Sequence, residues 1–381
     1  MITFDAVTKR YPDGTTAVGD LSLQVPTGKI TVFVGPSGCG KTTSLRMINR
    51  MIEPTSGRIL IDGQDTADLD PAELRRGIGY VIQHAGLFPH RTILDNVTTV
   101  PRLLGVDKKT ARAQGMDLLT RVGLPTSMAS RYPAQLSGGQ QQRVGVARAL
   151  AADPPIMLMD EPFSAVDPIV REQLQDELLA LQAELGKTIV FVTHDIDEAI
   201  KLGDQVAVLD VGGVLAQMAS PDRLLANPAS DFVADFVGRD RGFRALSFAA
   251  EQVPLEPLDP ALTIRLGDTP RDDGTPWVLV LDEHDAPQGW VEPHRIHGPV
   301  TREQLHRGGT VASLDGTLRQ ALDATLSSPA GLGVVVDADG RLAGTLRPAA
   351  VLEAIERGRI RAQQSGVAYD REPAPAVGER S

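Results

Sequence analysis

The chain contains one cysteine among its 381 residues, and aromatic residues make up only 4% of it. A single cysteine excludes any disulfide within the chain and suits a reducing cytoplasm. The scarcity of aromatic side chains disfavours a surface on which nucleic-acid bases stack. We therefore expect a cytoplasmic protein without a covalent cross-link of its own.

Long hydrophobic runs and an excess of positive charge are also missing. No apolar stretch approaches the ~18 residues of a membrane helix, and the residues after Met1 do not open a signal peptide. The formal net charge of -11 argues against a nucleic-acid partner, because surfaces that bind nucleic acid are usually basic. We expect a soluble chain, and any role at a membrane must come through partner proteins.

A glycine-rich loop follows a short strand near the N-terminus. Residues 30–34 are apolar and mostly β-branched, which predicts a buried strand. The next nine residues match the phosphate-loop pattern G-x-x-x-x-G-K-[ST], with a strand before and a helix after. Backbone N–H groups can converge on phosphates there, and the N-terminus of the following helix favours the same anion. The predicted ATP contacts are Gly35, Pro36, Ser37, Gly38, Cys39, Gly40, Lys41, Thr42 and Thr43.

Two residues of this loop have specific predicted roles. Lys41 is expected to reach the β- and γ-phosphates of ATP, and the Thr42 hydroxyl to ligate Mg²⁺. The lone cysteine, Cys39, lies inside the loop, so we expect it to react with alkylating reagents and to be protected by ATP.

An acidic pair ends a second buried strand, which the sequence predicts at residues 156–159. Asp160 is expected to hold Mg²⁺ directly or through water, as an acidic residue does in phosphate-loop enzymes. Glu161 is expected to polarise the attacking water as a general base. Two solvated carboxylates at a strand end are the alternative, but the phosphate loop at the same sheet edge favours an ATPase site.

Residues 136–143 read Leu-Ser-Gly-Gly-Gln-Gln-Gln-Arg, and Ser137 is a natural N-cap for a helix that continues through Leu150. With the phosphate loop and the acidic pair, this signature peptide makes the chain resemble the ATP-binding cassette (ABC) ATPases. The resemblance implies that ATP lies between two copies of the chain. One copy would give the phosphate loop, and the other would give Ser137, Gly138, Gly139 and Gln140.

The same resemblance assigns roles to residues that carry little information alone. Gln83, after a strand pattern at 79–82, is similar to the Q-loop glutamine that contacts Mg²⁺ and water and reports to the membrane partner. Asp167, in the stretch 164–167, is similar to the D-loop residue that reaches the opposite cassette. His194, after the strand pattern at 188–193, is similar to the switch histidine that binds the γ-phosphate and positions the water.

The adenine is expected to contact residues near the N-terminus. In the family an aromatic residue at the position of Tyr11 stacks on the base, and Val18 would add an apolar contact. The alternative for Tyr11 is an ordinary half-buried tyrosine at a strand end.

The resemblance implies an α/β fold for residues 1–240, with a RecA-like core, an N-terminal antiparallel β subdomain and a helical subdomain at about 84–150. Within it we expect a helix over 110–123 whose core-facing stripe is Ala113, Met116, Leu118, Leu119 and Val122. A helix over 222–237 and a linker over 238–247 should follow.

A weak internal repeat marks a second, α+β module at 241–361. Residues 277–291 and 333–346 each predict a strand, an acidic turn and a strand, and a helix starting near Thr317 precedes the second copy. The pair resembles cystathionine-β-synthase-like (CBS) motifs, although Arg295 and Ala350 occupy the positions where such motifs often place a ribose-binding Asp. A degenerate dimerising or regulatory domain is the alternative. Residues 362–381 are expected to be disordered.

Two further stretches narrow the family. Residues 46–57 and 86–90 resemble the ATP-binding subunits of importers for quaternary amines such as glycine betaine, carnitine, choline or proline betaine, and an appended CBS pair is a trait of that group. The resemblance implies a peripheral protein at the cytoplasmic face of the membrane, with integral permease subunits and, indirectly, a solute-binding protein as partners. Leu87, Phe88 and Pro89 would lie where the permease docks.

Three alternatives stay open at this stage. One is an importer for another small solute. A second is an ABC ATPase that acts in DNA repair or on ribosomes, but such proteins usually carry a coiled-coil insertion or two cassettes in one chain. The third is a regulator without turnover, which the presence of both Glu161 and His194 disfavours.

Overall fold

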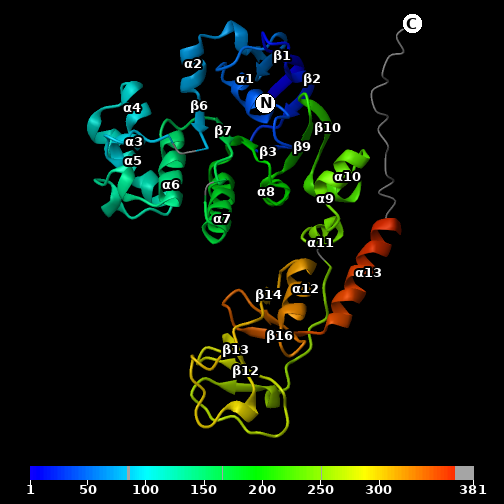
Figure 1. Ribbon diagram of the computed structural model, residues 1–381. Helices are drawn as coiled ribbons and strands as arrows, with labels where there is room; N and C mark the ends of the chain where they lie inside the picture. The colour runs from blue at the N-terminus through cyan, green and yellow to red at the C-terminus, as the bar shows by residue number, and fades with distance from the viewer. Residues whose placement is uncertain (84–85, 165, 250, 365–381) are drawn as a thin grey trace. The chain divides into compact units, whose positions relative to one another are not determined.

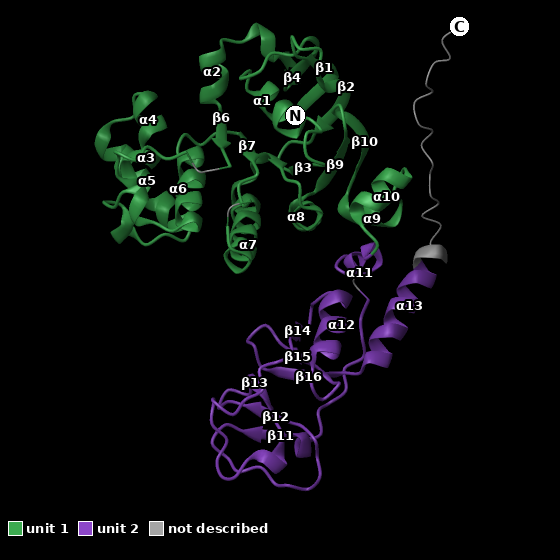
Figure 2. Ribbon diagram, viewed as in Figure 1, with its two compact units in different colours: residues 1–239 green, residues 240–381 purple. Residues whose placement is uncertain are grey.

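The computed structural model describes residues 1–83, 86–164, 166–249 and 251–364, and they divide into two units between Arg239 and Asp240 (Figure 2). The sequence places this boundary at residue 240. Each unit has its own sheets and its own hydrophobic clusters.

The first unit is built on a six-stranded sheet with the order β10-β9-β3-β8-β7-β6 (Figure 1). All neighbours are parallel except β10, which pairs antiparallel with β9. Every residue of β3, β7 and β8 is buried, as expected for parallel strands that are covered on both faces. The strands are β3 (Ile30–Val34), β6 (Ile78–Val81), β7 (Ile156–Asp160), β8 (Thr188–Val192), β9 (Gln205–Asp210) and β10 (Val214–Ala219).

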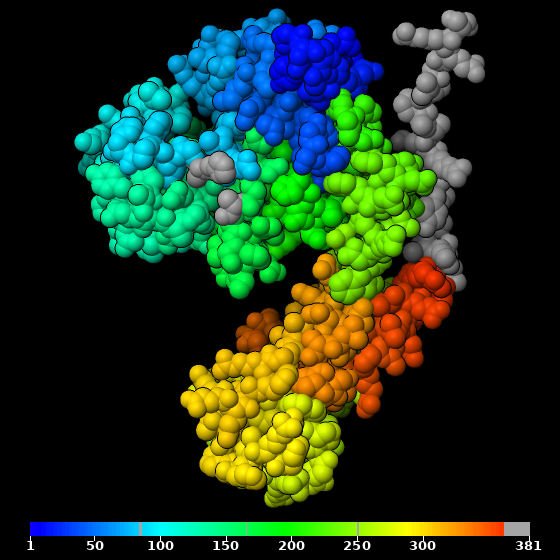
Figure 3. Space-filling model, in the orientation of Figure 1, coloured from blue at the N-terminus to red at the C-terminus, as the bar shows by residue number. Residues whose placement is uncertain are grey.

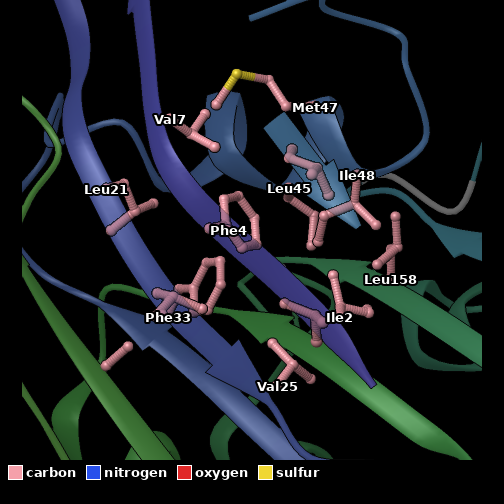
Figure 4. Close-up of a cluster of buried hydrophobic side chains, with 14 of the residues drawn as sticks. Ile2, Phe4, Val7, Leu21, Val25, Phe33, Leu45, Met47, Ile48 and Leu158 are labelled. Carbon is pink, nitrogen blue, oxygen red and sulfur yellow. The ribbon is translucent and has the colours of Figure 1, made fainter. Parts of the chain in front are cut away.

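A four-stranded antiparallel sheet forms the N-terminal part of this unit, in the order β2-β1-β4-β5. Its apolar side chains pack with those of β3 and α1 into one core, where the rings of Phe4 and Phe33 meet edge to face at 6.1 Å (Figure 4). The strands are β1 (Ile2–Arg10), β2 (Thr16–Val25), β4 (Ser56–Ile61) and β5 (Gln64–Asp65). This core fixes the position of the loop between β3 and α1.

The first unit also contains ten α-helices among the described residues. They are α1 (Lys41–Ile48), α2 (Pro71–Arg76), α3 (Ile93–Val97), α4 (Thr99–Leu103), α5 (Lys108–Arg121), α6 (Gly138–Leu150), α7 (Pro168–Leu185), α8 (Ile196–Leu202), α9 (Pro221–Ala226) and α10 (Asp231–Val237). No helix among the described residues is both long enough and apolar enough to cross a membrane.

The helices α3 to α6 form a lobe with its own hydrophobic cluster, coloured cyan to green in Figure 3. The helix predicted over 110–123 is α5, and it starts two residues earlier because Asp107 caps it by accepting the N–H groups of Lys109 and Thr110. The predicted core stripe is wrong at Ala113, which is exposed. Ala111 is buried in its place.

The single helix predicted over 222–237 is wrong, because two helices, α9 and α10, occupy this range. Pro228 lies at the break and has no N–H with which to continue α9. The Gln217 side chain spans the break by donating to the Asn227 carbonyl and accepting the N–H of Ala229. The predicted linker likewise contains a short helix, α11 (Arg241–Ala245).

The second unit contains two three-stranded sheets with the same topology. In each, the first strand pairs parallel with the second, and the second pairs antiparallel with the third. The sheets are β11 (Thr263–Arg265), β12 (Val278–Leu281) and β13 (Pro287–Val291), and β14 (Val311–Ser313), β15 (Gly333–Val336) and β16 (Leu342–Leu346). The acidic turns predicted in both copies join the antiparallel strands.

The two copies differ in their helices. The second copy has α12 (Leu318–Ser327), capped by Thr317 as the sequence predicts, and α13 (Pro348–Gln364). In the first copy, residues 266–277 contain no helix, and only a short 3-10 turn at Pro293–Arg295 follows β13. The predicted disorder is wrong for residues 362–364, which continue α13. Residues 365–381 lie outside the described part of the chain.

Candidate nucleotide-binding site

The loop between β3 and α1 requires glycine at two positions. Gly35 has a φ of 156°, and a Cβ on it would lie 2.2 Å from the Leu209 carbonyl oxygen. Gly40 caps α1 with a φ of 87°, and its Cβ would lie 2.1 Å from the Ala17 carbonyl oxygen. Any side chain at either position would push the loop off the two neighbouring strands. Ser37 and Gly38 are exposed at the tip of the loop.

The Lys41 side chain is only 6% exposed and folds back over this loop. Its Nζ donates to the carbonyl oxygens of Gly35, at 2.7 Å, and Pro36, at 2.9 Å. The ammonium group is thereby held at the centre of the loop. Thr42 and Thr43 follow it in the first turn of α1, both partly buried.

Cys39 is fully buried, and its Sγ lies 3.7 Å from Nζ of Lys41. Burial raises the pKa of the thiol, and the nearby Lys41 offsets only part of that increase. Because the thiolate is the species that reacts with alkylating reagents, the structure contradicts the expected sensitivity of this cysteine.

Oxygen atoms suited to a hard cation gather where β7 ends. The Thr42 hydroxyl donates to Oδ1 of Asp160 at 2.8 Å, and Asp160 is only 6% exposed. Hydroxyl and carboxylate oxygens are ligands that Mg²⁺ accepts, so this pair fits the predicted metal site. Oδ2 of the same carboxylate receives the Tyr80 hydroxyl at 3.4 Å and lies 3.7 Å from Nη2 of Arg46.

Sequence reasoning missed Arg46 and Tyr80. Burial raises the pKa of Tyr80, and the hydrogen bond to Tyr80 raises that of Arg46. The positions of these two residues could have indicated their contact with Asp160. Arg46 lies one helical turn beyond Thr42, and Tyr80 lies on β6, next to β7 in the sheet.

The three predicted catalytic residues meet at one carboxylate oxygen. Oε2 of Glu161 lies 3.2 Å from Nδ1 of His194 and accepts a long hydrogen bond of 3.5 Å from Nε2 of Gln83. The strands β6, β7 and β8 are adjacent, and one of these residues follows each strand at the same edge of the sheet.

Glu161 adopts a left-handed backbone conformation with a φ of 46°. For a residue other than glycine this costs of order 1–3 kcal/mol. The conformation is fixed because the Glu161 N–H donates to the Val192 carbonyl, and the Ser164 hydroxyl donates to the Glu161 carbonyl. The chain therefore turns sharply after β7 and holds the carboxylate at the sheet edge.

The signature peptide forms the N-terminus of α6. Ser137 and Gln140 cap the helix reciprocally, each side chain accepting the backbone N–H of the other. Gly138 is exposed. Gly139 is buried against α7, where a Cβ would lie 2.9 Å from Val170. An exposed helix N-terminus of this kind can receive an anion.

The remaining predicted residues lie in separate places. Asp167 is exposed and caps α7 by accepting the N–H of Ile169, while Ala165 of the same stretch lies outside the described residues. Tyr11 is partly exposed, with Nζ of Lys9 5.4 Å from the centre of its ring. Val18 is fully buried, and a Cβ on Gly40 would lie 3.1 Å from it. Its side chain therefore supports the phosphate loop and presents no surface to a base.

The chain is similar to known proteins. The profile of the family described as ABC transporter matches residues 18–164. The choline transport ATP-binding protein OpuBA of Bacillus subtilis is 43% identical over 368 residues, which cover 93% of this chain and 96% of OpuBA. The osmoprotectant import ATP-binding protein OsmV of Salmonella typhimurium is 42% identical over 374 residues, which cover 95% of this chain and 98% of OsmV.

A solved structure shows the same cassette fold. The dimeric post-hydrolysis state of the ATP-binding cassette MJ0796, bound to ADP and Pi, is 36% identical, with a TM-score of 0.53. The match covers 58% of this chain and 99% of MJ0796.

Proposed function

Because this chain belongs to the family of ABC transporter ATP-binding subunits that serve osmoprotectant uptake, we propose that it drives import of a quaternary-amine osmolyte by hydrolysing ATP. Glycine betaine, choline, carnitine and proline betaine are the candidate solutes. The similarity to choline and osmoprotectant transport proteins over nearly their whole length supports this choice. The observation that carries the catalytic part is the meeting of Gln83 and His194 at the Glu161 carboxylate.

ATP binds at the loop between β3 and α1. Two carbonyl contacts hold the Lys41 ammonium group in this loop before the nucleotide arrives. When ATP binds, Lys41 exchanges these contacts for oxygens of the β- and γ-phosphates. Backbone N–H groups of residues 35–43, among which Pro36 has none, contact the same phosphates. Tyr11 stacks on the adenine.

Thr42, Asp160 and Gln83 would hold Mg²⁺. The ion supplies positive charge at the phosphate oxygens when it is bound. Arg46 and Tyr80 keep the Asp160 carboxylate in place, since both lie within reach of its second oxygen.

Glu161 acts on the attacking water. Its carboxylate accepts a hydrogen bond from the water and takes its proton as the oxygen attacks the γ-phosphorus, while ADP leaves on the opposite side. His194 orients this carboxylate and contacts the γ-phosphate. The left-handed backbone at Glu161 limits the positions that the carboxylate can take.

A second copy of the chain completes each site. Its Ser137, Gly138, Gly139 and Gln140 present the N-terminus of α6 to the γ-phosphate of ATP held by the first copy, and its Asp167 reaches across the interface. Closing and reopening of this dimer moves two integral permease subunits, which receive solute from a binding protein. The chain acts as a peripheral protein at the cytoplasmic face of the membrane and has no nucleic-acid partner.

The second unit is a CBS-like pair with a regulatory or dimerising role. The common topology of its two sheets supports a duplicated motif. The first copy lacks a counterpart of α12 among the described residues, which supports a degenerate pair.

Uptake of labelled glycine betaine after osmotic upshift tests this function. The host lacks its other betaine uptake systems. It expresses the chain together with the permease and the binding protein encoded by neighbouring genes. The control is the same host with the Glu161→Gln chain. Uptake with the wild type alone is the expected result. No uptake with either chain, while the purified assembly hydrolyses ATP, would assign the ATPase to another small solute.

A further inference from the structure

Glu198 is a buried acid that the mechanism above does not use. It lies on α8 and is only 6% exposed. Its Oε2 accepts the hydroxyl of Thr193 at 2.6 Å, and its Oε1 accepts Nε2 of Gln175 at 3.1 Å. The carboxylate therefore ties α7 to the end of β8.

The hydrogen bond between Glu198 and Thr193 lies next to the switch histidine, His194. Thr193 directly precedes His194, and its hydroxyl also accepts the N–H of Asp195 at 3.0 Å. The Thr193 N–H donates to the Phe33 carbonyl of β3. The backbone before His194 is thus held by β3, and the backbone after it is held by the Thr193 hydroxyl that Glu198 orients.

The hydrogen bond between Glu198 and Gln175 reaches α7, the helix that starts after Asp167 of the candidate D-loop. Gln175 and Arg171 are four residues apart, so they share one face of α7. Nη2 of Arg171 donates to the Val166 carbonyl at 3.2 Å, and Nη1 lies 3.8 Å from Oδ2 of Asp195. The face of α7 that contacts Glu198 therefore also contacts Val166, which precedes Asp167, and Asp195, which follows His194.

We propose that Arg171, Gln175, Thr193 and Glu198 form a brace of positioning residues that couples the Asp167 loop to His194. Through this brace, engagement of Asp167 by the second copy sets the position of His194 beside Glu161. The proposal rests on the catalytic roles given above to His194 and Glu161 and on the place of Asp167 at the dimer interface.

The chemistry of the brace favours a positioning role over a stabilising one. Burial raises the pKa of Glu198, Asp195 adds to that increase, and the donors Thr193 and Gln175 offset part of it. A protein with apolar side chains in place of a buried charged group is often as stable as the original or more stable. A carboxylate instead offers two directed acceptors, and these set the spacing of two elements.

Two substitutions break the brace at opposite ends. Gln175→Leu removes the donor on α7, a helix to which the mechanism assigns no nucleotide contact. Thr193→Val removes the hydroxyl, and Thr193→Ser restores it. Gln182→Leu is the matched control, because Gln182 also lies on α7 and its Nε2 donates to the Gly28 carbonyl at 2.8 Å, away from His194.

The experiment compares binding with turnover in the purified full-length chain, below the melting temperature of every variant. Gln175→Leu and Thr193→Val are expected to lower kcat by about tenfold or more, because small displacements of a reacting group are costly. The Kd for MgATP should stay within about twofold, as for a loss confined to the reaction step. Gln182→Leu and Thr193→Ser should keep the wild-type kcat.

Coupling to the interface is tested by combining Gln175→Leu with Asp167→Ala. If the brace carries the signal, the double variant loses less kcat than the product of the two single losses. The brace would be overturned if the kcat loss of the double variant equals the product of the two single losses. It would also be overturned if Gln175→Leu and Thr193→Val both keep the wild-type kcat. In either case Glu161→Gln and His194→Ala should remain inactive. Wild-type kcat in His194→Ala would overturn the catalytic assignment itself, and the brace with it.

Discussion

Nδ1 of His194 lies 3.2 Å from Oε2 of Glu161, although the two residues follow different strands, β8 and β7. Because β7 and β8 are adjacent and parallel, both side chains emerge at the same edge of the sheet. The phosphate loop follows β3, which is the other neighbour of β8. Three parallel strands thus bring the phosphate-binding residues and the catalytic pair to one place.

The phosphate loop should tolerate a methyl group at Gly38 but not at Gly40. Both glycines have positive φ, yet a Cβ on Gly38 meets nothing within 4 Å, whereas one on Gly40 meets the Ala17 carbonyl at 2.1 Å. Gly38→Ala should cost about 1–2 kcal/mol of unfolding free energy from backbone strain alone. Gly40→Ala should cost about 3 kcal/mol or more, because a backbone atom must also move.

Chemical denaturation of the two variants measures this difference, and MgATP binding is the second readout. Gly40→Ala should lose ATP binding as well. Gly40 caps α1, and this helix begins with Lys41 and Thr42, which are proposed to contact ATP and Mg²⁺. Equal stability of the two variants would contradict the close approach of Gly40 to β2.

Glu198 should make the unfolding free energy depend on pH. Burial raises its pKa in the folded protein above the ordinary value of 4.5. A raised folded pKa means that the contribution of Glu198 is fully present below pH 4.5 and is lost as the pH rises through the folded value. The loss cannot exceed about 1.4 kcal/mol per pH unit.

Urea denaturation of the wild type and Glu198→Gln between acidic and neutral pH isolates this effect. The Gln side chain does not titrate, so the variant should gain stability relative to the wild type as the pH rises above 4.5. A stability difference independent of pH would show that Glu198 titrates normally.

Cys39 should react slowly with a maleimide in the folded chain. Its Sγ is buried and its thiol pKa is raised, so little thiolate is exposed at neutral pH. The same chain in urea should react much faster, at the rate of a free thiol. Mass spectrometry of timed samples measures both rates, and rapid labelling of the folded chain would contradict the burial.

The parts of the site that the sequence predicts are those carried by short contiguous motifs. The phosphate loop, the acidic pair and the capped helix at Ser137 each need only a few neighbouring residues. The phosphate loop and the acidic pair meet at one sheet edge because each follows a strand of the same parallel sheet. The break between α9 and α10 was also readable, because Pro228 lies in the middle of the expected helix.

Other features depend on contacts between distant residues. The stretch around Glu198 resembles a solvated helix start rich in acids, and its burial appears only when α7 packs against α8. Val18 lies on a strand whose apolar residues could face either side, and its burial depends on the approach of Gly40 and Gly213. Arg46, Tyr80 and Asp160 are far apart in sequence, so the contacts among their side chains arise only in the folded chain.

The purified Glu161→Gln chain with MgATP tests both the role of Glu161 and the sharing of ATP between two copies. Glutamine keeps the shape of the side chain but cannot take the proton of the attacking water. If Glu161 is the general base, the variant should show wild-type affinity for MgATP, loss of hydrolysis, and a stable dimer by size-exclusion chromatography with light scattering. Hydrolysis at the wild-type rate would contradict the role of Glu161, and a monomer that retains bound ATP would contradict the shared site.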